Sequence, residues 1–189
     1  MNAPLLLPLG KPPSPAELIH VATIWRGAML NLFARCEVLV HEALLAIESA
    51  GVTLPKNARH VGARARLNVL SNLIEQHELN GGGKAVRGRL AEWEKLMDQR
   101  CALAHGVFEF TQGKAVLRHT DFTGGKEKAR SYGPLGWQDM LSQLGELEKL
   151  QNDLRSQLGQ VRADCRNRKL AAGSAKTTEV KQATAPQTV

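Results

Sequence analysis

Apolar residues recur three and four positions apart over most of the first fifty residues. Ser14, Pro15 and Glu17 form a helix-start signature, because the serine caps the helix, the proline suits its first turn and the glutamate bonds back to the cap. The apolar positions that follow are Leu18, Ala22, Trp25, Met29, Leu32, Cys36, Leu39, Ala43 and Ile47. A glycine and a proline then interrupt the spacing, so we predict one long helix over residues 15–50.

The long helix carries a second apolar stripe beside the first. Its members are Leu30, Phe33, Val40 and Leu44. A helix that is apolar over more than one face buries more than one face. We therefore expect this helix to contact its own bundle and a second surface as well.

Two stripes of helical spacing follow the long helix. The first ends near Leu79, where Asn80 and three glycines form a strong stop signal, and the second begins near Lys84. Their apolar positions are Val61, Ala65, Leu70, Leu73 and Ile74, then Val86, Leu90, Trp93, Met97 and Ala104. Arg100 continues the second stripe between Met97 and Ala104. We predict that one continuous helix holds Arg100 along its buried side.

The period changes after residue 106. Phe108 and Phe110 alternate with Glu109, and Gln112-Gly113 divides two short runs, which predicts a hairpin over residues 107–119. Residues 120–136 are rich in glycine and lysine without an apolar period, so we expect a mobile basic loop. A last helix follows, with its apolar seam at Met140, Leu144, Leu147, Leu154, Leu158 and Val161.

These elements predict an all-α fold, a bundle of four to five helices with a short β-hairpin insertion after the helix that carries Arg100. We expect a flexible segment at residues 1–13, one helical domain over 14–163 and a disordered basic tail at 164–189, where apolar residues become rare. The chain has 189 residues, 43% of them hydrophobic, which fits a single core.

Composition narrows the classes of function. The net charge of +7 favours polyanionic partners without identifying one. The three cysteines, Cys36, Cys101 and Cys165, form no CxxC pair, so the sequence predicts neither a disulfide framework nor a metal site, and we expect no cofactor. No apolar run approaches the roughly 20 residues of a membrane span. We expect a cytoplasmic protein without membrane contact.

Residues 98–110 contain the candidate chemistry. Arg100 and His105 stand among small and apolar residues, and Gly106 follows as expected just past a helix end. The two side chains are five positions apart, so they share no helical face and form no closed site on their own. A structural interpretation stays open, in which Arg100 snorkels or pairs with an acid while His105 caps its helix.

The run Arg100-Cys101-Ala102-Leu103-Ala104-His105 resembles the R-x4-6-H motif of the HEPN superfamily, helical proteins of which many are metal-independent endoribonucleases in toxin-antitoxin and antiphage systems. The resemblance implies a HEPN-like bundle and a homodimer that joins two motifs in one RNA site. It implies that Arg100 stabilises charge on the scissile phosphate and that His105 transfers protons during attack by the 2′-hydroxyl, leaving a 2′,3′-cyclic phosphate and a 5′-hydroxyl. Cys101 stands where the family usually has a polar residue.

Two further residues are supporting candidates. Glu37 lies in the second stripe of the long helix, where a carboxylate needs a partner. It either holds Arg100 or a histidine in place, or pairs locally with His41. Cys101 lies four positions before His105, and a thiol nucleophile at this spacing is a weaker alternative because no substrate pocket is evident.

Basic residues outside the motif are candidates for RNA binding, and a solvated surface is the alternative interpretation. They are Lys56, Arg59, Arg64, Arg66, Lys126, Lys128 and Arg130. We therefore predict a dimeric HEPN-like endoribonuclease, a toxin or defence protein with RNA as substrate and an antitoxin as partner. The alternatives are an inactive HEPN-like interaction module and an unrelated helical nucleic-acid-binding protein.

Overall fold

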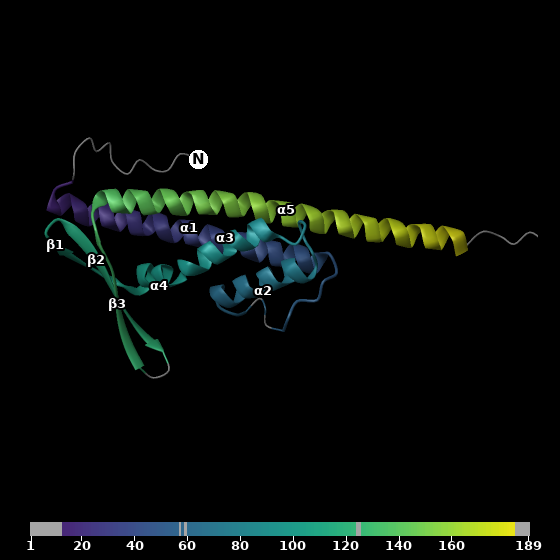
Figure 1. The fold of residues 1–189 in the computed structure, drawn as a ribbon, viewed down its shortest axis with the longest axis horizontal. Coiled ribbons are helices and arrows are strands. Elements are labelled where there is room, and N and C mark those ends of the chain that lie inside the picture. The colour runs from purple at the N-terminus through teal and green to yellow at the C-terminus, as the bar shows by residue number, and fades with distance from the viewer. Residues whose placement is uncertain (1–12, 57, 59, 124–125, 184–189) are drawn as a thin grey trace, which may run out of the picture. The chain divides into compact units, whose positions relative to one another are not determined.

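The computed structural model describes residues 13–56, 58, 60–123 and 126–183, and these form five helices and one sheet (Figure 1). The elements are α1 (Pro15–Ser49), α2 (Ala63–Gln76), α3 (Lys84–Lys95), α4 (Met97–His105), β1 (Val107–Thr111), β2 (Lys114–Thr123), β3 (Lys126–Leu135) and α5 (Trp137–Ala183). The mostly helical fold with a β insertion agrees with the prediction. The flexible segment expected at residues 1–13 lies outside the described residues except for its last one. No helix within the described ranges is long and apolar enough to cross a membrane.

Helix α1 begins as the sequence predicts. The Ser14 backbone amide donates to Glu17 Oε2 over 2.7 Å, and the Glu17 amide lies 3.4 Å from Ser14 Oγ, so the two residues cap the helix reciprocally. All nine positions of the predicted first stripe are buried. Three positions of the second stripe, Phe33, Val40 and Leu44, are buried as well. The predicted extent of this helix and its first stripe are confirmed, Leu30 of the second stripe is half-buried, and the contact with a second surface stays a prediction.

The chain divides into two compact units, and the single helical domain over residues 14–163 stays a prediction. The first unit contains residues 13–36 and 91–153, and the second contains residues 37–90 and 154–183. The first buries the rings of Trp25, Phe33 and Trp93. The second buries aliphatic side chains such as Ile47 and Ile74. Each unit therefore has its own apolar interior.

The helix predicted to run without interruption from Lys84 is two helices. The chain turns at Leu96, whose amide donates to the Trp93 carbonyl oxygen over 2.9 Å, three residues back. Leu96 then serves as the N-cap of α4 with φ −87° and ψ −4°. A tight turn of this kind leaves the three- and four-residue spacing of the apolar positions nearly unchanged. The spacing therefore gave no sign of the break. The motif therefore lies on α4, a separate nine-residue helix.

The hairpin predicted at residues 107–119 is present as β1 and the first half of β2. Its register pairs Val107 with Arg118 and Thr111 with Lys114. The two turn residues, Gln112 and Gly113, have φ values of 50° and 69°. Positive φ at both central residues is the requirement of a type I′ turn, which matches the twist of a hairpin. This prediction is confirmed.

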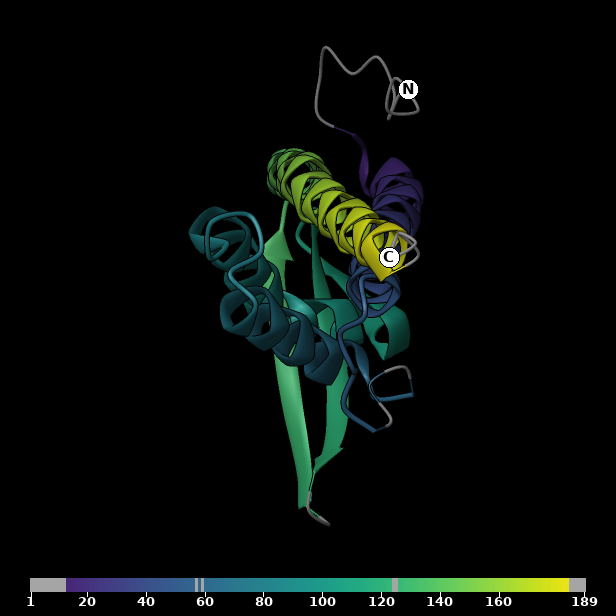
Figure 2. The same cartoon turned by 90° about the vertical axis from the view of Figure 1, so that its right-hand side faces the viewer.

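The loop predicted over residues 120–136 is wrong, because β2 continues to Thr123 and β3 pairs with it in the order β1-β2-β3. Figure 2 shows β2 and β3 running side by side. Glu127, Lys128 and Ala129 are all exposed, although neighbouring residues of a strand point to opposite faces. A strand with two exposed faces has no apolar alternation, which removed the signal that identifies strands.

The disordered tail expected from residue 164 differs from the structure, in which α5 continues to Ala183. Cys165 is buried, and Asp164 Oδ2 accepts a hydrogen bond of 2.9 Å from the Asn80 amide. Arg168 donates from Nη1 to the His77 carbonyl oxygen over 2.7 Å. One further turn of α5 thus contacts the turn between α2 and α3, all within the second unit. So few buried positions give no recognisable period.

Candidate functional site

The residues of the predicted motif lie on α4 in the first unit. Arg100 is half-buried, and His105 is the exposed last residue of the helix. Arg26 of α1 donates from Nη2 to the Ala104 carbonyl oxygen over 3.0 Å. The last four carbonyl groups of a helix lack partners within it, so Arg26 satisfies one of them. The end of α4 that carries His105 is thereby held to α1.

Gly106 holds the same helix end against the sheet. Its φ is −79°, so glycine is not required here by a left-handed backbone. A Cβ atom at this position would lie 2.5 Å from the Ala102 carbonyl oxygen and 2.6 Å from that of Arg118. The backbone of β2 thus passes directly over the end of α4. Only a residue without a side chain permits this approach.

The approach of β2 brings a second imidazole to the motif. The ring centroids of His105 and His119 lie 6.1 Å apart, with 32° between the ring planes. Nε2 of His119 lies 3.7 Å from Sγ of Cys101. Both contacts join helix α4 to strand β2, and we call Arg100, Cys101, His105 and His119 the motif cluster.

Sequence reasoning missed His119, although a signal for it exists. Along β2, Ala115 and Leu117 are buried and His119 is half-buried, whereas Arg118 and Thr120 are exposed. Residues two apart in a strand lie on one face of the sheet, and Ala115 and Leu117 mark the covered face. The alternation therefore places His119 on the face that α4 covers. The hairpin prediction ended at this residue and drew no consequence from it.

Several arginines lie on the elements around the motif cluster. Arg130 of β3 forms an ion pair with Asp98 of α4, and Arg118 Nε lies 2.7 Å from Glu109 Oε2. Arg26 and Arg100 add two more guanidinium groups on α1 and α4. Guanidinium groups suit the binding of phosphate groups.

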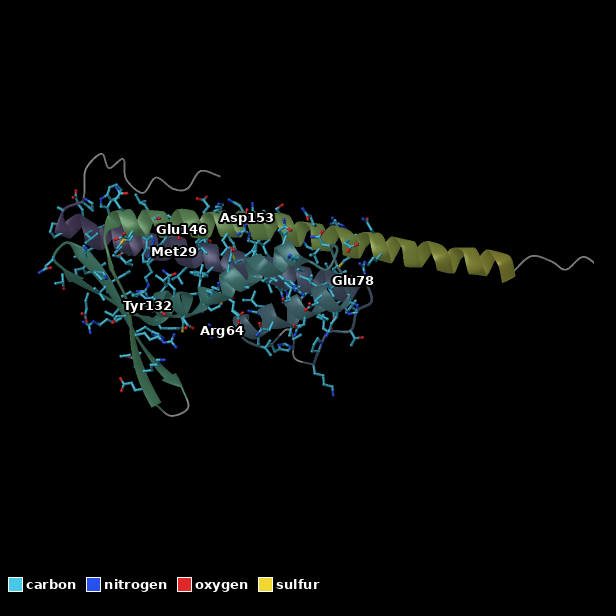
Figure 3. The ribbon with its side chains drawn as sticks, viewed as in Figure 1. Met29, Arg64, Glu78, Tyr132, Glu146 and Asp153 are labelled. Atoms are coloured by element: carbon cyan, nitrogen blue, oxygen red, sulfur yellow. The ribbon has the colours of Figure 1, made fainter. Side chains whose placement is uncertain are left out.

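The motif cluster is not part of the described cavity in this unit. That cavity has a volume of about 570 Å³ and lies among α1, α3, α4, β3 and α5. Figure 3 labels three residues of its lining, Met29, Tyr132 and Glu146. Arg100, Cys101, His105 and His119 are absent from the lining. His105 is instead exposed on the surface, where a ligand of any length can reach it.

Comparisons with family models, with curated proteins and with solved structures gave no match for this chain. The HEPN resemblance therefore depends on the six-residue motif and the order of the helices, and it stays a prediction. Among the described residues, no group of three or more His, Cys, Asp or Glu side chains is arranged to hold a metal ion.

Glu37 belongs to the second unit, whereas Arg100 belongs to the first. Its Oε2 atom forms an ion pair with Arg66 Nη2 at 3.6 Å, a pairing that neither sequence interpretation included. Both side chains are about one-fifth exposed, 20% for Glu37 and 22% for Arg66. Arg66, a candidate for RNA binding, is thus engaged with a carboxylate of its own unit.

The remaining basic candidates fall into both units. In the second unit, Lys56 and Arg64 are exposed, and Arg59 lies outside the described residues. In the first, Lys128 is exposed on β3 and Arg130 pairs with Asp98. Lys126 begins β3, and its side chain is not among those described. Only the candidates on β3 share a unit with the motif cluster.

Proposed function

We propose that this chain is a metal-independent endoribonuclease that uses Arg100 and His105 of α4. The observation that carries the proposal is the placement of His105, an exposed imidazole on a helix end that α1 and β2 hold on two sides. A proton-transfer group works best when its position is fixed before the substrate binds. Arg100 lies on the same short helix and adds a permanent positive charge.

The proposed reaction uses the 2′-hydroxyl of RNA as the nucleophile. Its oxygen forms a bond to the adjacent phosphorus atom while its proton is removed, and the bond from phosphorus to the 5′-oxygen breaks as that oxygen gains a proton. The products are a 2′,3′-cyclic phosphate and a 5′-hydroxyl. His105 transfers protons, and the guanidinium of Arg100 stabilises the extra negative charge on the phosphate in the transition state.

The surface position of the motif favours a polymeric substrate. Small-molecule sites are usually enclosed cavities that bury most of the ligand, and the motif cluster lies outside the described cavity. An extended polyanion instead binds through phosphate contacts spread over a surface. The net charge of +7 and the arginines around α4 support RNA in this role.

The test is cleavage of a structured RNA by purified protein in EDTA, with the ends mapped for cyclic phosphate. The wild type should cleave, and His105→Ala and Arg100→Met should each lower the rate by about a hundredfold or more. His20→Ala changes an exposed histidine of α1 in the same unit and is the matched control. Expression of the wild type should slow cell growth, and His105→Ala should relieve it.

Two results would contradict the proposal. Cleavage that persists in both motif variants would assign the activity to a contaminant. RNA binding without cleavage by the wild type would favour the inactive interaction module instead. Circular dichroism of each variant separates loss of chemistry from loss of fold.

A further inference from the structure

We propose that the cavity of the first unit binds an uncharged adenine-type base, as carried by a free nucleoside. The cavity has a volume of about 570 Å³, and every residue that lines it belongs to the first unit. Small-molecule sites in proteins usually have volumes of about 300–1,000 Å³. None of the residues of the motif cluster lines the cavity, so this inference does not rest on the proposed function.

The deepest part of the lining is apolar. Met29 of α1 and Leu147 and Leu150 of α5 are buried. Tyr132 of β3 adds a half-buried aromatic ring, and Figure 3 labels this residue together with Met29. Protein sites that hold a nucleobase enclose its flat faces between aromatic and apolar side chains and bind its edge through hydrogen bonds. The apolar lining therefore suits the faces of a planar base.

Two glutamine side chains supply hydrogen-bonding groups for the edge of such a base. Gln99 of α4 and Gln143 of α5 both line the cavity and are half-buried. Gln99 Nε2 donates to Gln143 Oε1 over 2.9 Å, which is the one hydrogen bond of these two side chains within the described part of the chain. Gln99 Oε1 can therefore still accept and Gln143 Nε2 can still donate. Exchanging oxygen and nitrogen in both amides keeps their mutual bond and again leaves one acceptor and one donor.

An adenine base carries the matching groups side by side. Its exocyclic amino group donates and a neighbouring ring nitrogen accepts, which is how a single glutamine amide contacts adenine in the major groove of DNA. In the cavity, Gln99 accepts from the amino group and Gln143 donates to the ring nitrogen. Because the two amides already hold each other, less side-chain freedom is lost on binding. Cytosine has the same pair of groups, but its single ring fills less of a cavity of this size.

The charges of the lining favour a ligand without phosphate. Glu92, Asp98 and Glu146 contribute three carboxylates, and Lys95 contributes one ammonium group. Asp98 is in an ion pair with Arg130, and without it the carboxylates still outnumber the ammonium group. A phosphate group would be repelled by these carboxylates, whereas an uncharged nucleoside would not. We therefore expect adenosine to bind more tightly than AMP, which has the same base.

The first test is calorimetric titration of the full chain with adenosine and three related probes. Adenosine should bind with a Kd of about 10–100 μM, the range that the usual binding energy per atom gives for a ligand of this size. Purine riboside, which lacks the exocyclic amino group, should bind about tenfold more weakly because one hydrogen bond is lost. AMP should also bind about tenfold more weakly or worse, and cytidine more weakly than adenosine. AMP that binds as tightly as adenosine would overturn the inference.

The second test removes the amides one at a time. Gln99→Leu and Gln143→Leu should each raise the Kd for adenosine about tenfold, because each leaves one group of the base without a partner. Gln138→Leu, at an exposed position of α5 that does not line the cavity, is the matched control and should keep the wild-type Kd. Circular dichroism of each variant separates loss of binding from loss of fold. Binding that neither lining variant weakens would assign the ligand to another place and overturn the inference.

The location of the ligand is measured directly by NMR on the wild type, which does not depend on any variant folding. Adenosine should give nuclear Overhauser contacts from its base protons to the Met29 methyl group and the Tyr132 ring. Adenosine that binds without these contacts, or that gives no binding heat and no shift changes at about 1 mM, overturns the inference. A protein that binds adenosine but cleaves no RNA loses the proposed function alone, and one that cleaves RNA without binding adenosine loses this inference alone.

Discussion

Arg26 of α1 donates a hydrogen bond of 3.0 Å to the carbonyl oxygen of Ala104, the residue directly before His105. This contact joins α1 to the end of α4, and the two residues are 78 positions apart in the chain. A hydrogen bond with a charged donor contributes about 1.5–3 kcal/mol to stability. The position of the His105 imidazole thus depends on a residue far outside the motif.

We expect Arg26→Met to lower RNA cleavage about tenfold to a hundredfold, because a shift of about 1 Å in a catalytic group has effects of this size. The free energy of unfolding should fall by about 1–3 kcal/mol. Arg35→Met, at an exposed position of the same helix, is the control. Cleavage rates and urea unfolding measure the two effects. A variant that is destabilised yet cleaves at the wild-type rate would show that Arg26 does not position His105.

Gly106→Ala should be strongly destabilising. The new Cβ atom would meet the carbonyl oxygens of Ala102 and Arg118 at 2.5 and 2.6 Å, and backbone oxygens cannot move aside as a flexible side chain does. We expect a loss of about 1–3 kcal/mol or more. Thermal unfolding measures the change in stability. NMR measures whether the His105 and His119 rings stay in contact.

Gly27→Ala is the matched control for this prediction. Gly27 lies inside α1, and nothing stands within 4 Å of the Cβ atom that alanine would add. Alanine there should stabilise the protein by about 0.5–1 kcal/mol, because glycine costs helix stability through backbone entropy. If alanine lowers the stability at position 106 and raises it at position 27, the cause is the close approach of backbone oxygens to Gly106 and not the loss of a glycine as such.

Helical elements were predictable because each buries one face repeatedly. All six positions of the seam predicted between Met140 and Val161 are buried, as is the first stripe of α1. The end of the helix at Asn80 and the three glycines was predictable for a different reason. Asn80, Gly81, Gly82 and Gly83 all adopt positive φ, which glycine and asparagine tolerate best.

Three features had no local signal. The break at Leu96 keeps helical spacing, so periodicity passes through it. β3 exposes both of its faces over Glu127, Lys128 and Ala129, so it lacks apolar alternation. The meeting of His105 with His119 depends on how β2 crosses the end of α4, and this is a tertiary contact between residues 14 positions apart in sequence. The alternation along β2 marks the covered face on which His119 lies, but only the tertiary contact places this residue beside His105.

Asp164 should make the second unit sensitive to acid. The hydrogen bond from the Asn80 amide is the main cause that lowers the pKa of this carboxyl below its ordinary value of 3.8, and Arg168 also lowers it. A carboxyl whose pKa is lower in the folded state contributes stability that is present above the unfolded value and is lost as pH falls through the folded value. The contribution is therefore complete near neutral pH and disappears in acid below 3.8.

The test is Asp164→Asn in urea unfolding at two pH values. At about pH 7 the variant should be less stable than the wild type by about 1–3 kcal/mol, because a charged acceptor is replaced by a neutral one. In acid well below 3.8 the difference should vanish, because the wild-type carboxyl is then protonated too. An equal difference at both pH values would show that Asp164 acts through shape alone.

The three cysteines should react with a thiol reagent in a fixed order that is set by their burial. Cys36 and Cys165 are 0% and 2% exposed, and burial raises the pKa of Cys165, with the charge of Asp164 adding to the effect. The thiolate is the reactive form, so Cys165 should be slow and Cys36 inaccessible. Half-buried Cys101 should react first, and His119→Gln should change the rate of that reaction by replacing the side chain that contacts Sγ. Labelling followed by peptide mapping identifies each thiol, and unfolding in urea should release all three. Fast labelling of Cys36 or Cys165 in the folded protein would contradict their burial, and an unchanged labelling rate of Cys101 in His119→Gln would contradict the contact between the thiol and the imidazole.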